Sequence, residues 1–150
     1  MDSSSDRGNF ATPVRLRSLR MFEILDATED DLVAVRVGSG TADGYEEFYS
    51  LLIERTKQHG SIRVYEEVPN WTARTYLTHL HGIVPDLRYG PEFDIRSYAC
   101  VGDSFWAKLL FHQWRAIRPV WPVAPDDMRY FHLDNRDDAL RWLRNVSARS

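Results

Sequence analysis

The sequence reads LVAVRV at residues 32–37 and, after a short break, DGYEEFYSLLIERTKQHGSIRVY at residues 43–65. The first run is short and apolar, which predicts a strand. The second carries apolar side chains at helical spacing as far as Gly60, a residue that commonly ends helices. It then closes on another apolar run, Ile62–Tyr65, which predicts a second strand. A strand, a helix and a strand in this order indicate an α/β unit with parallel strands.

The same alternation continues on both sides of this unit. Met21–Leu25 is an apolar run that an acidic turn separates from residues 32–37, which predicts an antiparallel hairpin. Further predicted elements are a helical region from about Thr72, a strand at Ile95–Val101, a helix from about Ser104 to Ile117, a strand at Met128–Leu133 and a helix from about Asp137 to Val146. We therefore expect an α/β fold with a mainly parallel sheet of about five strands, an N-terminal antiparallel hairpin and four helices.

Length and composition limit the organisation of the chain. With 150 residues, one domain is expected. Residues 1–20 are rich in Ser, Arg and Asp without periodicity, so we interpret them as a flexible extension and residues 21–150 as the domain. A net charge of −3 argues against nucleic-acid binding, which favours strongly basic proteins. The single cysteine and the lack of a signal-peptide or membrane-spanning run predict a cytoplasmic protein.

No motif in the sequence predicts catalysis, a metal or a cofactor. A nucleophile elbow, a P-loop and a dinucleotide fingerprint are all missing. Cys100 lies within a predicted strand, which favours a buried and unreactive thiol. His79 and His81 lie two positions apart on a predicted helix and point to different sides, so we expect solvated histidines instead of a metal site.

Polar residues follow the predicted strand ends, at the edge where open α/β sheets bind ligands. These residues are Glu66, Glu67, Asn70, Asp103, Ser104 and Asp134. They form a candidate site, to which Thr72 adds the nearest hydroxyl. The alternative is that Thr72, Asp103 or Ser104, and Asp134 cap helices while the glutamates face water.

The predicted helix at 104–117 has more apolar surface than one sheet requires. Its apolar side chains spread over about 200° of the helical wheel, about twice the arc that packing needs. We assign a candidate apolar surface to Phe111 and Trp114 on this helix and to Val120, Trp121 and Val123 in the proline-rich loop after it. This surface would meet a partner, a second copy of the chain, a lipid or a membrane, or the loop would fold back over its own helix.

Several motifs, in order, resemble the SpoIIAA-like family over about residues 21–146. They are Met-Phe-Glu-Ile-Leu at 21–25, Asp-Leu-Arg-Tyr-Gly at 86–90, Val-Gly-Asp at 101–103, Met-Arg-Tyr-Phe at 128–131 and Ala-Leu-Arg-Trp-Leu at 139–143. The resemblance implies a STAS-type fold, a β–α superhelix distantly similar to CRAL-TRIO lipid-binding domains, and no known enzyme activity.

The resemblance also implies a comparison with the STAS proteins that antagonise anti-sigma factors. Those proteins are switched by phosphorylation of a serine in an Asp-Ser motif, where the third strand gives way to the next helix. Here that junction reads Val-Pro-Asn-Trp-Thr at 68–72, without an Asp-Ser pair. Thr72 is the nearest hydroxyl, so this chain departs from the pattern on which the switch depends.

Three functions remain open on these grounds. The favoured hypothesis is a non-catalytic binding or regulatory module that acts through protein–protein contact, including a homodimer. The alternative is binding of a lipid or another apolar small molecule, or association with a membrane surface. The third is an enzyme that uses the carboxylates at the strand ends.

Overall fold

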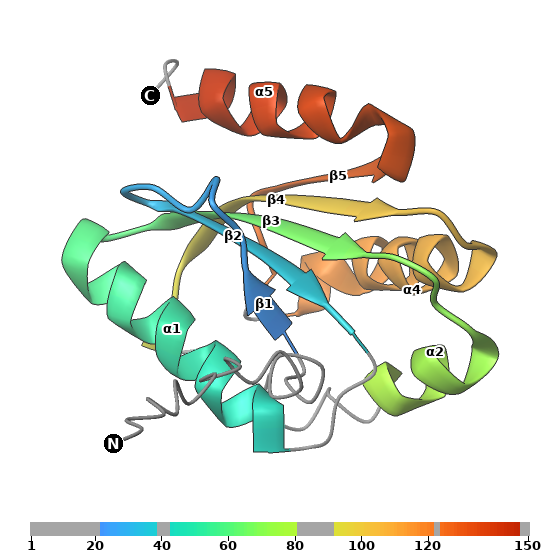
Figure 1. Cartoon of the computed structure of the whole chain (residues 1–150). Helices are drawn as coiled ribbons and strands as arrows, with labels where there is room; N and C mark the ends of the chain where they lie inside the picture. The colour runs from blue at the N-terminus through green and yellow to red at the C-terminus, as the bar shows by residue number, and fades with distance from the viewer. Residues whose placement is uncertain (1–21, 39–42, 81–91, 122–123, 148–150) are drawn as a thin grey trace, which may run out of the picture.

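Five strands form one mixed sheet in the computed structural model of this chain, which describes residues 22–38, 43–80, 92–121 and 124–147 (Figure 1). The strands are β1 (Phe22–Ile24), β2 (Leu32–Val37), β3 (Ile62–Val68), β4 (Ile95–Gly102) and β5 (Asp127–His132). They lie in sequence order, with β1 antiparallel to β2 and every later pair parallel. The predicted hairpin and mainly parallel sheet are confirmed.

Helices cover both faces of the sheet. They are α1 (Asp43–His59), α2 (Ala73–Leu80), α4 (Phe105–Ile117) and α5 (Arg136–Ser147), with 3-10 turns η3 (Arg118–Val120) and η4 (Leu133–Asn135). Of the described helices, Figure 1 shows α5 on one side of the sheet and α1, α2 and α4 on the other. The three layers bury both faces of the central strands, as parallel strands require.

Each face has its own hydrophobic core. On the α5 side, Ala139 and Leu143 are fully buried in one cluster with Tyr65 and Val101, so the last helix packs on the sheet. On the other side, α1 and α4 cover a larger core. Its buried members include Val33, Val35, Val37, Leu52, Val64, Val68, Leu110 and Phe111.

Two element boundaries show that a local sequence signal can set the end of an element, or that pairing with neighbouring strands can override it. Gly60 ends α1 as predicted, with a positive φ of 83° and its N–H donating to the Thr56 carbonyl at 2.7 Å. The predicted end of the next strand at Tyr65 is wrong, because β3 continues to Val68. Strands on both sides hold it in register, β4 as far as the pairing of Val68 with Gly102. The predicted extension at residues 1–20 lies outside the described residues.

Candidate functional site

The sequence predicted that Glu66 and Glu67 follow a strand end, but both lie inside β3. Successive side chains of a strand point to opposite faces. Glu66 therefore points to the α1 and α4 side, where it lines a cavity, and Glu67 points toward α5, where it contacts Arg136. The two carboxylates cannot act together on one substrate, and the longer strand is the physical reason.

The predicted site residues at the helix starts have capping roles. Ser104 accepts a hydrogen bond from the Ala107 N–H at 3.2 Å, so it caps α4 instead of beginning it. Thr72 accepts from the Thr75 N–H at 3.3 Å in front of α2. These contacts satisfy backbone donors that a helix start leaves open.

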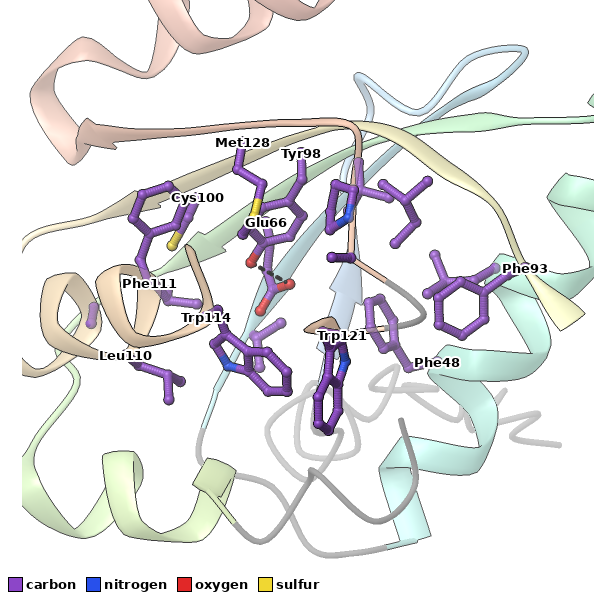
Figure 2. Close-up of a pocket in the computed structure, with 18 of the residues that line it drawn as sticks. Phe48, Glu66, Phe93, Tyr98, Cys100, Leu110, Phe111, Trp114, Trp121 and Met128 are labelled. Carbon is purple, nitrogen blue, oxygen red and sulfur yellow. Dashed lines mark hydrogen bonds between the residues drawn. The ribbon is translucent and has the colours of Figure 1, made fainter. Parts of the chain in front are cut away.

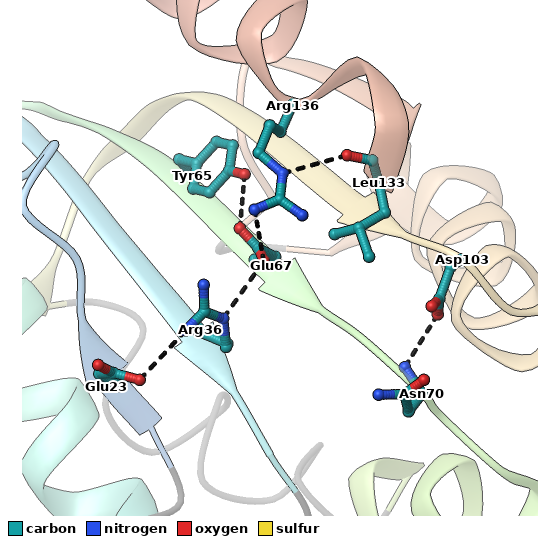
Figure 3. Close-up of polar contacts among 8 residues, drawn as sticks. All are labelled: Glu23, Arg36, Tyr65, Glu67, Asn70, Asp103, Leu133 and Arg136. Atoms are coloured by element: carbon teal, nitrogen blue, oxygen red, sulfur yellow. Dashed lines mark hydrogen bonds and ion pairs between the residues drawn. The ribbon is translucent and has the colours of Figure 1, made fainter.

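Asn70 and Asp103 connect the two loops that lead into α2 and α4. The Asn70 N–H donates to Asp103 Oδ1 at 2.9 Å, and Asn70 adopts a positive φ of 58° (Figure 3). Asp134 lies in η4, where its own N–H donates to His132 Nδ1 at 3.2 Å and its side chain is exposed. The structure thus joins Asn70 with Asp103, whereas Asp134 interacts with His132.

Glu67 is the centre of a polar cluster on the α5 face (Figure 3). Its buried carboxylate accepts from the Tyr65 hydroxyl at 2.8 Å and from Arg36 Nε at 3.2 Å, and Arg136 Nη1 lies 3.8 Å away. Arg36 also reaches Glu23 at 3.3 Å. Each oxygen of the buried Glu67 carboxylate is thereby offered a donor, so this cluster ties β1, β2, β3 and α5 together.

The predicted apolar surface divides into buried and exposed parts. Phe111 is only 3% exposed and packs near Tyr130 on β5, so assigning it to a surface was wrong; the helix presents it to the sheet. The rings of Trp114 and Trp121 meet edge to face with centroids 5.3 Å apart, so the loop folds back over its own helix at this point. Val120 is 82% exposed, and Val123 lies outside the described residues.

Behind these two tryptophans lies a cavity of about 160 Å³ (Figure 2). It lies between the sheet and the helices α1 and α4, and the rings of Trp114 and Trp121 lie on the side away from the strands. Its walls are mostly apolar and rich in aromatic rings. The aromatic members are Phe48, Tyr49, Trp71, Phe93, Tyr98, Phe111, Trp114 and Trp121. Pockets of this composition, with few polar groups, are typical of small-molecule sites.

Glu66 is the carboxylic acid in this cavity. Its side chain accepts a hydrogen bond from the Tyr98 hydroxyl at 3.0 Å, and it is partly exposed because it borders the cavity (Figure 2). Burial disfavours the charged form and raises the pKa of Glu66 to about 7, although the Tyr98 hydrogen bond opposes this. The carboxyl group therefore titrates close to neutral pH.

Cys100 borders the same cavity beside Tyr98. It is 5% exposed, as predicted, and burial and the nearby Glu66 carboxylate raise the pKa of its thiol well above the usual range. A thiol in this state is a poor nucleophile. Its role at the cavity wall is that of a small apolar side chain.

The sequence contained a signal for this cavity, which was missed because Glu66 was interpreted as a residue that follows a strand end. Within β3, Val64, Glu66 and Val68 alternate and share one face, so a carboxyl group stands between two core positions. Such a residue needs a partner or a cavity. The remaining wall residues come from β2, α1, β4, α4 and β5 and from loops, among them those that hold Trp71, Phe93 and Trp121, and their meeting has no local signature.

Metal binding and membrane insertion can each be assessed within the described ranges. Across those residues, no group of three His, Cys, Asp or Glu side chains is placed to hold a metal ion. The side chain of His79 and all of His81 lie outside the described part. In the same part of the chain, every helix is too short or too polar to cross a membrane.

A family model described as SpoIIAA-like matches residues 32–144, which is more than half of the chain. The match covers β2 to α5 and therefore every element that lines the cavity. No curated protein and no solved structure matches the chain.

Proposed function

Because this chain belongs to the SpoIIAA-like family, we propose that it is a non-catalytic binding module, and that its ligand is a small apolar or amphipathic molecule held in the cavity. The observation that supports this most directly is the aromatic cavity of about 160 Å³ beneath Trp114 and Trp121. A cavity of roughly 150 Å³ with apolar walls is large enough to bind benzene. The wall of this one fits the apolar part of a ligand of that size or a short segment of a longer chain.

The apolar excess of α4 supports a ligand more than a protein partner. Leu110 and Phe111 are buried in the core, and Trp114 borders the cavity. Much of the apolar surface of α4 therefore already packs inside the protein. Contact with a protein partner, the other function that the sequence favours, would use the exposed remainder, such as Phe105 and Val120 at opposite ends of α4 and η3. We therefore place binding of a small apolar molecule first.

The proposal is tested by filling the cavity. Leu110 lines the cavity and Leu109, its neighbour on α4, does not. Leu110→Trp should abolish binding of benzyl alcohol, followed by ligand-observed NMR, whereas Leu109→Trp should retain it. Extra volume in a packed core costs about 1–3 kcal/mol, so circular dichroism must show that both variants are folded.

A smaller substitution provides a second test in case Leu110→Trp does not fold. Val64→Leu adds one methylene group to the sheet side of the same cavity. Weaker binding of benzyl alcohol in this variant supports the proposal. If wild type does not bind benzyl alcohol, or if the filling variants bind it as well as wild type does, the cavity is not a ligand site.

A further inference from the structure

The cavity contains an acid without a counter-charge. Among the described residues that line it there is no Lys, Arg or His, and the hydrogen bond to Glu66 comes from the neutral Tyr98 hydroxyl. Glu67, one position along, has Arg36 and Arg136 beside it. A carboxylate among apolar walls is costly unless a cation accompanies it, so the absence of a cation beside Glu66 within the described lining favours a ligand that brings one.

The aromatic wall is suited to the same kind of ligand. Tyr49 and Phe93 stack with ring centroids 5.7 Å apart, and Trp114 and Trp121 meet edge to face at 5.3 Å. All four rings line the cavity that Glu66 borders. Ring faces attract ammonium groups, most strongly for tryptophan, and aromatic cages are a recurrent way to bind them.

We propose that the ligand of this cavity is a protonated amine on a small apolar body, with Glu66 as its counter-ion and the aromatic rings around both the ammonium group and the apolar part. This inference rests on the cavity being a ligand site and adds the chemical class of the ligand. Binding is a simple association, in which the ammonium group donates hydrogen bonds to the carboxylate. A ligand carboxylate, by contrast, would meet Glu66 as a like charge.

Three probes of nearly equal size separate the charge from the apolar body: benzylamine, benzyl alcohol and benzoate. Titration calorimetry or ligand-observed NMR should show benzylamine binding at least about tenfold more tightly than the other two, a ratio worth about 1.4 kcal/mol. Glu66→Gln should reduce the preference for benzylamine over benzyl alcohol from at least about tenfold to nearly none. The matched control is Glu47→Gln, which removes an exposed carboxylate from α1 and should change neither affinity.

The pH dependence provides an independent readout. Among the described residues of the cavity wall, the other titratable groups are Tyr49 on α1 and Tyr98 and Cys100 on β4. The pKa values of Tyr98 and Cys100 lie above their usual range, so both stay neutral near pH 7. Benzylamine affinity should therefore fall as the pH drops below about 7 and Glu66 is protonated, and it should be flat in Glu66→Gln.

The outcomes distinguish the two proposals. If benzyl alcohol binds and benzylamine binds no better, or if benzoate binds best, the amine inference is overturned while the cavity remains a ligand site. The amine inference also fails if Glu66→Gln retains the full preference for benzylamine. If none of the three probes binds, the proposed function fails together with the inference.

Discussion

Glu66 is placed against the preference of its side chain. It shares a face of β3 with Val64 and Val68, both buried, and one hydroxyl group is its hydrogen-bond partner. Such a position weakens folding unless something else compensates for the charge. In a binding protein the ligand supplies the compensating charge, and the protein without its ligand is less stable.

The first prediction concerns this cost. In the folded protein the pKa of Glu66 is about 7, above its ordinary value of 4.5, so the folded state binds the proton more tightly than the unfolded chain does. The destabilisation is thus absent below a pH of about 4.5, grows as the pH rises, and is complete above about 7. Its upper bound is on the order of 3 kcal/mol, and water at the cavity reduces it.

Glu66→Gln removes the titration and should therefore be more stable than wild type above pH 7. Urea denaturation at a series of pH values measures the difference in the free energy of unfolding. The advantage of the variant should shrink toward pH 5. A difference that does not change with pH would show that Glu66 has no raised pKa.

The second prediction concerns Thr72, whose hydroxyl caps α2. Thr72→Ala should lower the free energy of unfolding by about 1 kcal/mol, while Thr72→Ser, which keeps the hydroxyl, should cost little. Thermal denaturation of both variants measures this. Neither should affect benzyl alcohol binding, because Thr72 does not line the cavity. Phosphorylation of Thr72 in cells, with altered binding in Thr72→Glu, would instead favour a regulatory role.

At the scale of the elements, the turn from β4 into α4 limits what the site tolerates. Gly102 ends β4, Ser104 caps α4, and Ala107 in the first turn of α4 is buried beside the cavity. A methyl group added at Gly102 would lie 3.1 Å from the Ala107 side chain and from the Tyr130 hydroxyl. The helix can approach the sheet this closely because Gly102 has no side chain.

The third prediction follows from this contact. Gly102→Ala should push α4 away from the sheet and lower the free energy of unfolding by about 1–3 kcal/mol, as overpacking does. The benzyl alcohol affinity should change with it, because α4 forms one wall of the cavity. Thermal denaturation and ligand-observed NMR check the two effects. If Gly102→Ala keeps both the wild-type free energy of unfolding and the wild-type affinity, the turn from β4 into α4 accommodates the methyl group without cost.

At the scale of the whole molecule, the N-terminal residues provide the fourth prediction. Residues 1–20 carry no periodic apolar face, and the family match begins at residue 32. A chain that begins at Met21 should melt within about 4 °C of the full chain, a shift that corresponds to roughly 1 kcal/mol for a protein of this size. A much larger drop in melting temperature would show that the segment packs on the domain or on a second copy.

The fifth prediction concerns self-association. Ile117 and Val120 are 37% and 82% exposed at the end of α4 and in η3, and Val120 belongs to the apolar surface predicted there. If a second copy covers them, sedimentation velocity should show a homodimer for wild type and weaker association for Val120→Ser. Leu77→Ser, at an exposed position on α2, is the matched control. A monomer across all micromolar concentrations would exclude the dimer.

The sequence by itself determined the order of the elements, because the signals for them are local. Each of these signals, such as apolar spacing, Gly60 and the caps at Thr72 and Ser104, acts on residues only a few positions away. The β-β-α-β-α-β-α-β-α order and the mixed sheet were therefore predictable. Glu66 was also recognisable as an unusual residue, although its place was misjudged.

Only the tertiary structure decided where β3 ends and what Glu66 faces. The strand extends past Tyr65 because two neighbouring strands pair with it, and neither neighbour is local in sequence. The cavity arises because side chains from α1, β3, β4 and α4 and from Trp121 meet around it. Packing of this kind depends on the shapes of surfaces distant in sequence, and periodicity carries no information about whether they leave a space between them.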